Sequence, residues 1–465
     1  MNEFEFGALE AARAIRQGEL SATELTRHML ERIEAKDHQY NSFTDVTAER
    51  ALAEAHAVDA QRARGETLPP LAGVPYAVKN LYDVERLVTL AGSKINRDRA
   101  PAIEDATLVK RMKHSGAILL GALNMDEYAY GFTTENTHYG PCRNPHDTNR
   151  TAGGSSGGCS AAVAGGLAPL TLGSDTNGSI RVPASLCGIF GLKPTFGRLS
   201  RWGTYPFVAS LDHLGPFARS AEDLAACYDA LQYADAQDHA CAQRGVDLAF
   251  PQLLRGIEGL RIAVASAYFH DYAGMEAREA VADVAQALGA TRTVEIPQAH
   301  RARAAAFLIT ASEGGALHLP DLRTRPDDFD PNTRDRLIAG VLTPAAWVYQ
   351  AQRFRNWYRE RVLEIFKDVD LIIAPATPVP ATPLGQENLE LHGQTLPLRP
   401  SMGLLTQPIS FIGLPVVAAP VAKAGLPLGV QLIAAPWRED IALRVAHYLE
   451  TMGVCAAPLA ASAYD

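Results

Sequence analysis

A glycine- and serine-rich stretch at residues 151–195 constrains the chain more than any other part of the sequence. It contains two short loops, Gly153–Gly158 (GGSSGG) and Gly173–Ser179 (GSDTNGS), that combine glycines with hydroxyl side chains. Glycine permits tight backbone bends, and successive backbone N–H groups in such loops can bind an anion. Between the loops, Cys159–Gly165 is predicted to be a short helix and Leu167–Leu172 a buried strand. Two such loops beside one compact unit indicate a functional site more than glycines used for packing.

The first loop contains patterns that suggest two other kinds of site. Gly153–Gly157 reads G-x-S-x-G, the turn that presents a serine nucleophile after a strand. The preceding residues 142–150 are polar and include Pro145, so we expect a loop there and no strand. Cys159-Ser160 stands where a phosphate-binding P-loop has Lys followed by Ser or Thr. Neither a nucleophile elbow nor a nucleotide site is predicted.

GGSSGG together with GSDTNGSIRVPASLCGIFGLKPT resembles the signature of the amidase signature family of serine hydrolases. Leu71–Asn80 (LAGVPYAVKN) is similar to that family's lysine-bearing strand. The resemblance implies a catalytic set of Lys79, Ser155 and Ser179, with Ser179 as the nucleophile and Ser155 following a cis peptide bond. It extends from about Ala12 to Leu449, and the match is strongest at residues 71–217.

The second loop is the expected oxyanion hole. By the same resemblance, its backbone N–H groups come from Thr176, Asn177, Gly178 and Ser179. Asn177 departs from the family pattern, because a glycine is common at that position. The shape of the loop is therefore left open.

The chemistry places a condition on Lys79. A serine hydroxyl is a weak nucleophile, and an ordinary lysine with a pKa of about 10.4 is protonated at neutral pH and cannot act as a base. The apolar residues 74–78 predict a desolvated site, which would lower the pKa of the amine. Neutral Lys79 could then accept a proton from Ser155, which relays it from Ser179. Without the resemblance, a lysine at a strand end would be interpreted as a surface residue.

Other segments are candidates for substrate contacts. The resemblance implies that residues 124–128, with Met125 and Tyr128, and residues 134–136 form walls of the pocket. It also implies that an arginine from the segment Arg334–Arg336 can hold a substrate carboxylate. The alternative for this segment is a solvated charge run at a helix start, because acids alternate with the arginines. Asp126 and Glu127 are interpreted as capping or solvated residues and not as an acid–base pair.

The expected fold class is α/β, with a mixed central sheet covered by helices on both faces, as the amidase signature resemblance implies. Short apolar runs at residues 76–78, 118–120 and 167–172 predict buried strands, separated by helical patterns such as Ala106–His114. We expect one amidase domain spanning residues 1–465, a signature core at about 71–217 and a more variable pocket region at about 233–400. The segment Pro380–Pro400 is predicted to be an ordered loop.

Composition excludes several classes of protein. A chain with 47% hydrophobic and 20% charged residues is neither disordered nor fibrous, and a net charge of −9 gives no general attraction for nucleic acid. The six cysteines lack paired spacing, so we expect mostly buried free thiols. No metal-binding motif is present, and neither a metal nor a cofactor is expected. Residues 1–6 lack the order of a signal peptide and no apolar run could span a bilayer, so we expect a cytoplasmic protein without a membrane partner.

The expected activity is hydrolysis of an amide through an acyl-enzyme on Ser179, acting on a small polar, anionic urea- or biuret-type molecule with release of ammonia. One alternative is the glutamine-hydrolysing subunit of a tRNA-dependent amidotransferase. Such subunits commonly carry an acid just before the segment matching Leu404–Pro408, where this chain has Ser401-Met402-Gly403. A catalytically silent assembly subunit is the other alternative, and the retention of Lys79, Ser155 and Ser179 argues against it. The relatives also suggest a homodimer or a complex with a small helical subunit.

Overall fold

The fold is built around one mixed sheet. The computed structural model describes residues 5–464, so residues 1–4 of the N-terminal segment considered above lie outside it. The sheet has eleven strands in the order β1-β3-β2-β8-β10-β9-β16-β17-β13-β11-β12. Strands β3, β2 and β8 are parallel neighbours, as are β13, β11 and β12, while the strands between these groups pair antiparallel. This confirms the expected α/β class with a mixed central sheet.

The strands of this sheet have the following bounds: β1 Phe43–Val46, β2 Pro75–Lys79, β3 Ile118–Leu123, β8 Leu170–Asp175, β9 Phe190–Lys193, β10 His213–Ala218, β11 Ile262–Ala265, β12 Arg292–Val294, β13 Leu371–Pro375, β16 Val416–Pro420 and β17 Gly429–Ala434. Three two-stranded ribbons lie outside it: β4 Glu135–Asn136 with β5 Gly140–Pro141, β6 Arg143–Asn144 with β7 Asp147–Thr151, and β14 Asn388–Leu391 with β15 Gln394–Pro397.

The helices have these bounds: α1 Ala8–Gln17, α2 Ala22–Tyr40, α3 Ala48–Ala63, α4 Thr107–His114, α5 Gly157–Ala164, α6 Arg181–Leu186, α7 Ala221–Leu231, α8 Tyr268–Asp271, α9 Met275–Ala287, α10 Ala299–Thr324, α11 Pro331–Val341, α12 Ala345–Ile365, α13 Leu398–Ser401, α14 Gln407–Ser410 and α15 Glu439–Thr451. Short 3-10 turns occupy Ile95–Asp98, Glu127–Ala129, Phe250–Arg255, Pro326–Asp328 and Ala461–Ala463.

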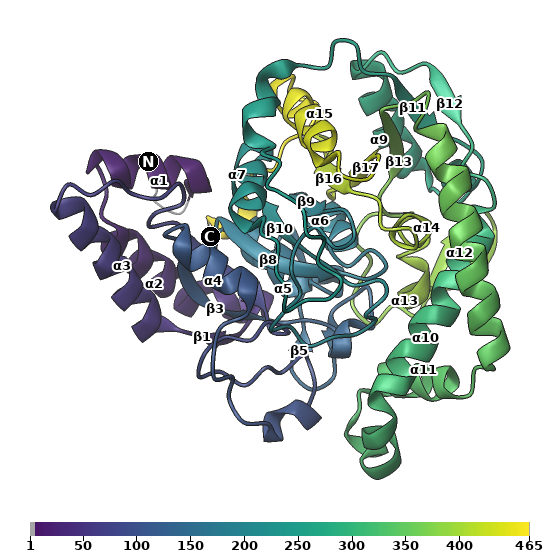
Figure 1. The fold of residues 1–465 in the computed structure, drawn as a ribbon, viewed down its shortest axis with the longest axis horizontal. Coiled ribbons are helices and arrows are strands. Elements are labelled where there is room, and N and C mark those ends of the chain that lie inside the picture. The colour runs from purple at the N-terminus through teal and green to yellow at the C-terminus, as the bar shows by residue number, and fades with distance from the viewer. Residues whose placement is uncertain (1–4, 465) are drawn as a thin grey trace.

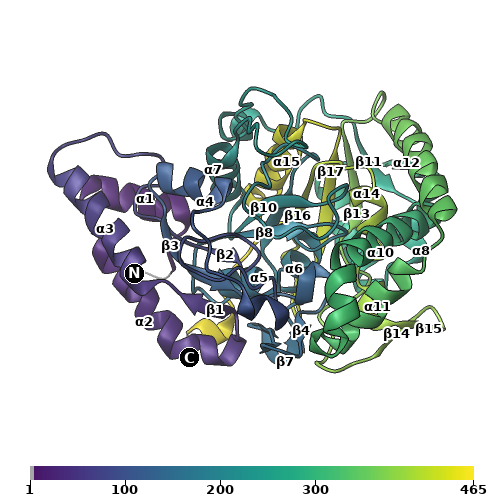
Figure 2. The same ribbon diagram turned by 60° about the horizontal axis from the view of Figure 1, so that its bottom comes forward.

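The helices surround the sheet. Helices α7 and α15 lie on one side of it and α5 and α6 on the other (Figure 2). Helices α1–α3 form one end of the molecule and α10–α12 the opposite end (Figure 1). The long helices α10 and α12 therefore lie at the end of the molecule that contains the strands β13, β11 and β12 (Figure 1).

Three local predictions differ from the structure. Residues 142–150 are not the strand-free loop expected from the sequence, because their backbone pairs across a turn at Pro145-His146 to form the β6–β7 hairpin, and β7 directly precedes the GGSSGG loop. The sequence predicts that the second loop begins at Gly173, but β8 continues to Asp175, because its ladder with β10 extends to the pair His213↔Asp175. The segment Pro380–Pro400 is not a plain loop, since it contains the β14–β15 hairpin and the start of α13. Hydrophobic side chains explain this hairpin, because Leu389 and Leu391 are buried in a small apolar cluster with Phe132 and Met402.

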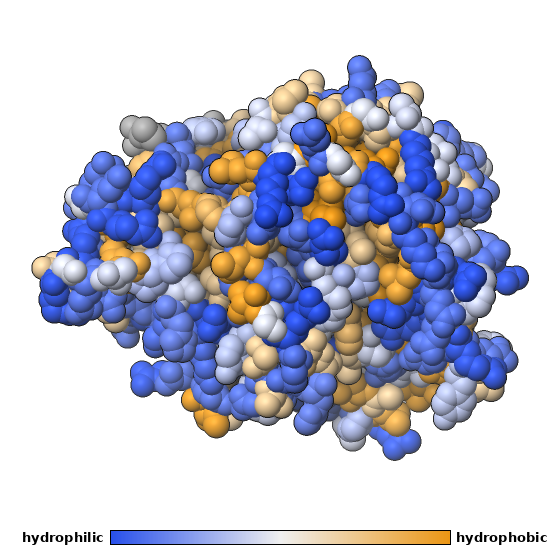
Figure 3. Space-filling view, turned by 45° about the horizontal axis from the view of Figure 1, so that its top comes forward, coloured by the Kyte–Doolittle hydropathy of each residue, from blue (hydrophilic) through white to orange (hydrophobic). Residues whose placement is uncertain are grey.

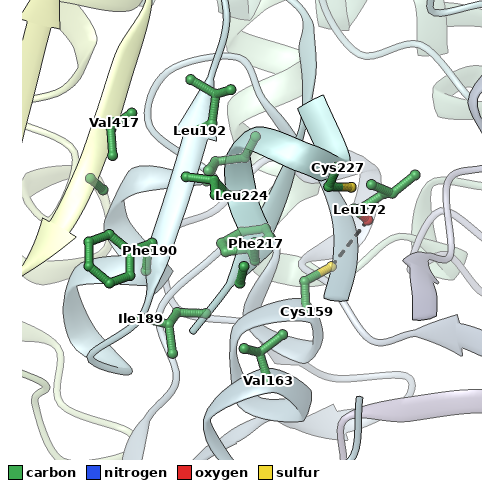
Figure 4. Packing of buried hydrophobic residues seen from close by; sticks show 14 of the residues in the cluster. Cys159, Val163, Leu172, Ile189, Phe190, Leu192, Phe217, Leu224, Cys227 and Val417 are labelled. Carbon is green, nitrogen blue, oxygen red and sulfur yellow. Dashed lines mark hydrogen bonds between the residues drawn. The ribbon is translucent and has the colours of Figure 1, made fainter. Parts of the chain in front are cut away.

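The core is continuous around the central strands. Apolar side chains from β8, β9, β10 and the helices α5 and α7 interlock there, as Figure 4 shows for Val163, Phe190, Phe217 and Leu224. All six cysteines are buried free thiols, as expected, and Cys159 in this cluster donates its S–H to the carbonyl oxygen of Leu172. Such close packing fixes the strand ends from which the site is built.

The outer surface is mixed in character. Hydrophobic side chains on the face in Figure 3 form small patches among hydrophilic ones. Within residues 5–464, no helix is both long and apolar enough to cross a bilayer.

Candidate active site

Lys79 ends strand β2 and is completely buried. Its Nζ atom lies 2.7 Å from Ser155 Oγ, 2.9 Å from Ser156 Oγ and 2.9 Å from Ser174 Oγ. The hydroxyl of Ser156 donates to the carbonyl oxygen of Ser174, so Ser156 Oγ must accept a hydrogen from the amine. A neutral amine could donate its two hydrogens to Ser156 and Ser174, which leaves its lone pair facing Ser155.

Burial lowers the pKa of Lys79 to about 8, because the low-dielectric interior disfavours the ammonium form. Nearby Cys159, Asp126, Asp175 and Asp212 oppose this shift, since negative charge favours the ammonium. The neutral form that a base requires is therefore accessible near physiological pH, and the ammonium still predominates at pH 7.

The GGSSGG loop joins β7 to α5 and contains a cis peptide bond between Gly154 and Ser155. The backbone N–H of Asp126 donates to the carbonyl oxygen of Ser155, at 3.3 Å. A Cβ atom on Gly154 would lie 2.2 Å from the carboxylate of Asp126, so no larger residue fits there. The cis bond coincides with the position implied for Ser155, and this carboxylate forms one wall of the loop.

Asp126 and Glu127 are not solvated, because both are buried, and the Asp126 side chain does not cap the 3-10 turn that follows it. The Asp126 carboxylate accepts the backbone N–H of Thr134 at 2.9 Å and pairs with Arg399 at 3.0 Å. The Glu127 carboxylate lies 3.0 Å from His138 Nε2 and accepts the backbone N–H of Asp330. Burial raises the pKa of both carboxyl groups. They brace two separate loops and do not converge on one bond.

The loop that follows β8 is held by the side chains of Asp212 and Thr406. Thr176 Oγ1 donates to Asp212 at 2.6 Å, and Thr406 Oγ1 donates to the carbonyl oxygen of Asn177 at 2.7 Å. Gly178 has a φ of 141°, and a Cβ there would lie 2.0 Å from Thr406 Oγ1. Only glycine meets both conditions.

A buried ion pair anchors both ends of this loop. Arg181, at the start of α6, binds the carboxylate of Asp175 at 3.0 Å and the side-chain oxygen of Gln431 at 2.7 Å. The Arg181 guanidinium holds the pKa of Asp175 well below its usual range, although burial acts in the opposite direction. Among the described residues, the backbone N–H groups of residues 176–179 donate to no protein acceptor, so they are free to bind an oxyanion.

Asn177 does not distort the loop. Its backbone lies outside the left-handed region that favours glycine. Its side-chain Nδ2 donates to Thr310 Oγ1 on α10, at 2.9 Å.

Ser179 lies in a cavity formed where the signature core meets the helices α10 and α11. The residues lining it are Ala129, Tyr130, Gly131, Phe132, Thr176, Asn177, Ser179, Phe207, Phe307, Thr310, Arg336 and Gln407. A larger cavity of about 1010 Å³ adjoins it, sharing Ala129, Thr176 and Phe207, and also reaches Ser174. In residues 5–464, no hydrogen bond connects Ser179 Oγ to Ser155, so that step of the relay stays a prediction.

The two arginines of the charge run have different surroundings. Arg336 lines the cavity, its Cζ lies 3.6 Å from the centroid of the Tyr130 ring, and it donates to the Tyr130 carbonyl oxygen at 2.9 Å. Burial lowers its pKa, and no carboxylate of the described chain lies within 4.0 Å of its guanidinium. Arg334 instead pairs with Asp327 and Asp335, which are both exposed. The structure thus brings only Arg336 to Ser179.

Met125 and Tyr128 are not among the residues that line this cavity, contrary to the sequence-based expectation. Both are buried in the core behind it, where Tyr128 accepts a hydrogen bond from Ser93 and its ring centroid lies 3.9 Å from that of His318. Tyr128 and Ala129 both have left-handed backbone conformations, with φ of 51° and 60°, and Tyr130 lines the cavity instead of Tyr128.

Several residues of the site are not found by sequence reasoning. Ser174 stands in the sequence only as part of a loop, although it contacts Lys79. Tyr130, Phe307 and Thr310 belong to no motif, because two of them lie on α10 in the most variable part of the chain. The described residues contain no group of three His, Cys, Asp or Glu side chains placed to hold a metal ion.

Comparisons with known proteins agree with this geometry. The amidase family model matches residues 24–443. The chain is 59% identical to AtzE, a 1-carboxybiuret hydrolase subunit of Pseudomonas sp. (strain ADP), over 96% of this chain and 98% of that protein. It is 38% identical to a glutamyl-tRNA(Gln) amidotransferase subunit of Roseiflexus sp. (strain RS-1), over 94% of each chain.

Solved structures give the same result. A chain from a vestigial protein complex that reveals the origins of an s-triazine catabolic enzyme superposes with a TM-score of 0.96 at 58% identity, over 97% of this chain and all of that one. A crystal structure of an amidase superposes with a TM-score of 0.87 at 32% identity, over 96% of this chain and all of that one. The chain therefore belongs to the amidase signature family, whose members are hydrolases that act on carbon–nitrogen bonds.

Proposed function

We propose that Ser179 is the nucleophile of this hydrolase and that Ser155 and Lys79 together accept its proton. The support is the 2.7 Å contact between Lys79 and Ser155, the lowered pKa of Lys79, and the cis bond at Ser155. Neutral Lys79 takes the hydroxyl proton of Ser155, which takes that of Ser179, so that Ser179 Oγ can attack the carbonyl carbon of an amide.

The rest of the cycle follows from the balance of atoms and charge. The tetrahedral intermediate places its negative oxygen at the backbone N–H groups of residues 176–179. When the carbon–nitrogen bond breaks, the ammonium of Lys79 returns its proton through Ser155 to the departing nitrogen, which leaves as ammonia. Water then attacks the acyl carbon on Ser179 and gives a proton through Ser155 to Lys79. When the bond from this carbon to Ser179 Oγ breaks, the ammonium of Lys79 returns a proton through Ser155 to Ser179 Oγ, and the acid is released.

The substrate is an anionic urea-type amide, and we propose 1-carboxybiuret. The observation that carries this proposal is the guanidinium of Arg336, which lines the cavity of Ser179 without a carboxylate partner among the described residues. A partly desolvated guanidinium offers a planar, permanently charged donor pair that suits a carboxylate. The 59% identity to a 1-carboxybiuret hydrolase subunit supports the choice of this substrate.

The test is ammonia release from a panel of freshly prepared 1-carboxybiuret, glutamine and simple uncharged amides. We expect the highest kcat/KM for 1-carboxybiuret. A preference for glutamine would instead assign the chain to the amidotransferase type. No turnover of any amide by the purified, folded protein would favour a silent assembly subunit.

We also propose that the protein is cytoplasmic and works either as a homodimer or with a small helical subunit. The complex described for the s-triazine enzyme supports an assembly of some kind. Light scattering after purification, with and without co-expressed neighbouring gene products, measures the mass. A fully active monomer would contradict this proposal.

A further inference from the structure

The cavity at Ser179 contains a buried acceptor with no partner. Asn177 is 6% exposed and lines the cavity, and its Oδ1 atom makes no hydrogen bond within residues 5–464. A buried polar atom without a partner destabilises the protein, because it has lost its hydrogen bonds to water. In the cavity of Ser179, such an atom is available to a donor group of a bound molecule.

The orientation of this side chain is fixed at both ends. Thr310 Oγ1 accepts a hydrogen bond from Nδ2 at 2.9 Å, and Thr406 Oγ1 donates to the backbone carbonyl oxygen at 2.7 Å. With one Nδ2 hydrogen bonded to Thr310, the Oδ1 atom of this cavity-lining side chain remains available as an acceptor. Thr310 is itself buried on α10, so the pair joins the oxyanion loop to the helical end of the molecule.

We propose that Asn177 Oδ1 accepts an N–H of the substrate next to the scissile carbonyl, and so selects ureido substrates over ordinary carboxamides. This inference rests on the proposed function and names the feature of the substrate that is recognised. A urea-type amide has an N–H on the far side of the reacting carbonyl, where a carboxamide such as glutamine has a CH₂. A CH₂ in that position would leave the buried oxygen unpaired, which gives strong discrimination.

The position itself is also informative. The backbone of Asn177 needs no left-handed conformation, so the glycine common in the family is not replaced for reasons of geometry. What the asparagine adds is its side-chain amide. The addition occurs two residues before the nucleophile Ser179 and in the same cavity.

The experiment compares biuret with malonamide as competitive inhibitors of 1-carboxybiuret hydrolysis, because the two molecules differ only in a central NH or CH₂. The wild-type protein is expected to bind biuret more tightly. In Asn177→Gly, the inhibition constant of malonamide divided by that of biuret should fall about tenfold, since one buried hydrogen bond to biuret is lost. Thr310→Val, which frees Nδ2, should also lower this ratio. Thr310→Ser, which keeps the hydroxyl, should leave the ratio near the wild-type value.

The outcomes separate the two claims. Equal binding of biuret and malonamide by the wild-type protein, or an unchanged ratio in Asn177→Gly, would overturn the role of Asn177 while leaving 1-carboxybiuret hydrolysis standing. Absence of 1-carboxybiuret hydrolysis in the wild-type protein would overturn both. Melting temperatures of all variants report folding, and the Thr310 pair decides the question if Asn177→Gly does not fold.

Discussion

The two walls of the active site differ in how their polar groups are satisfied. On the wall formed by Lys79, Ser155, Ser156 and Ser174, here called the catalytic wall, the lysine amine is completely buried and lies within 2.9 Å of three hydroxyl groups. On the recognition wall, formed by Tyr130, Asn177, Thr310 and Arg336, three polar groups lack part of their partners within residues 5–464. These are the Tyr130 hydroxyl, Asn177 Oδ1 and the Arg336 guanidinium.

This difference separates chemistry from selection. Groups that must hold one geometry for proton transfer are fully bonded to the protein before any substrate binds. Groups that select the substrate keep capacity for bonds that only the correct molecule supplies. Ser179 lines the cavity with the recognition wall, and the proposed proton relay joins it to the catalytic wall, so changes to the two walls should affect different kinetic constants.

A second comparison shows that burial alone does not make a base. Lys193 is also completely buried at a strand end, and burial lowers its pKa to about 7. Its amine donates to the carbonyl oxygen of Pro194 and contacts no serine hydroxyl in the described chain. What distinguishes Lys79 is therefore the cluster of hydroxyl groups around it.

The largest effect is expected from Ser179→Ala. Removing the nucleophile should lower kcat about 10⁴-fold or more while the melting temperature stays near that of the wild type. Ser156→Ala is the matched control, because it removes a neighbouring hydroxyl that bonds Lys79 but does not line the cavity. A severe loss in Ser156→Ala with a mild one in Ser179→Ala would reverse the assignment.

Lys79→Arg should lower kcat about 10²–10⁴-fold, because a guanidinium stays protonated and cannot accept the serine proton.

The role of Lys79 as the base also predicts the pH profile of the wild-type protein. Since only the neutral amine is active, kcat/KM should rise with pH through about 8, the pKa to which burial lowers Lys79. Stopped assays from pH 6 to 10 measure this rise. A profile that is flat over this range, or near-normal activity of Lys79→Arg, would remove the base from the catalytic wall.

On the recognition wall, Arg336→Lys should raise KM for 1-carboxybiuret by an amount equivalent to about 1.5–3 kcal/mol, since lysine cannot replace the bidentate guanidinium. KM for an uncharged amide should change far less. Arg334→Lys is the matched control, because its exposed ion pairs contribute little. Equal losses on both kinds of substrate would show that Arg336 supports the fold and does not bind a carboxylate.

These two arginines show how far the sequence could predict the site. Both lie in one charge run, and the resemblance to a family could not choose between them. At about 100° per residue, side chains two positions apart on a helix point in nearly opposite directions. Only the packing of α11 against α10 and residues 129–132 decides that Arg336 faces the cavity.

The signature core was predictable for a different reason. The strands β2 and β3 are the short apolar runs expected at residues 76–78 and 118–120. Lys79, Ser155 and the loop 176–179 stand in motifs whose residue types are dictated by the chemistry. Tyr130 and Thr310 instead depend on how distant segments pack, and no local pattern encodes that information.

The smallest effect is expected on the catalytic wall, from Ser174→Ala. Ser174 Oγ is one of three hydroxyl groups at the amine of Lys79, and the 2.7 Å contact with Ser155 does not depend on it. We expect kcat to fall about tenfold or less, because the amine loses one of its anchors and is held less firmly toward Ser155. The lost acceptor stabilises the ammonium more than the amine, so the midpoint of the pH profile should also move to lower pH. A loss as large as that of Lys79→Arg, or a midpoint shifted upward, would mean that Ser174 takes part in proton transfer and that the catalytic wall extends beyond Lys79 and Ser155.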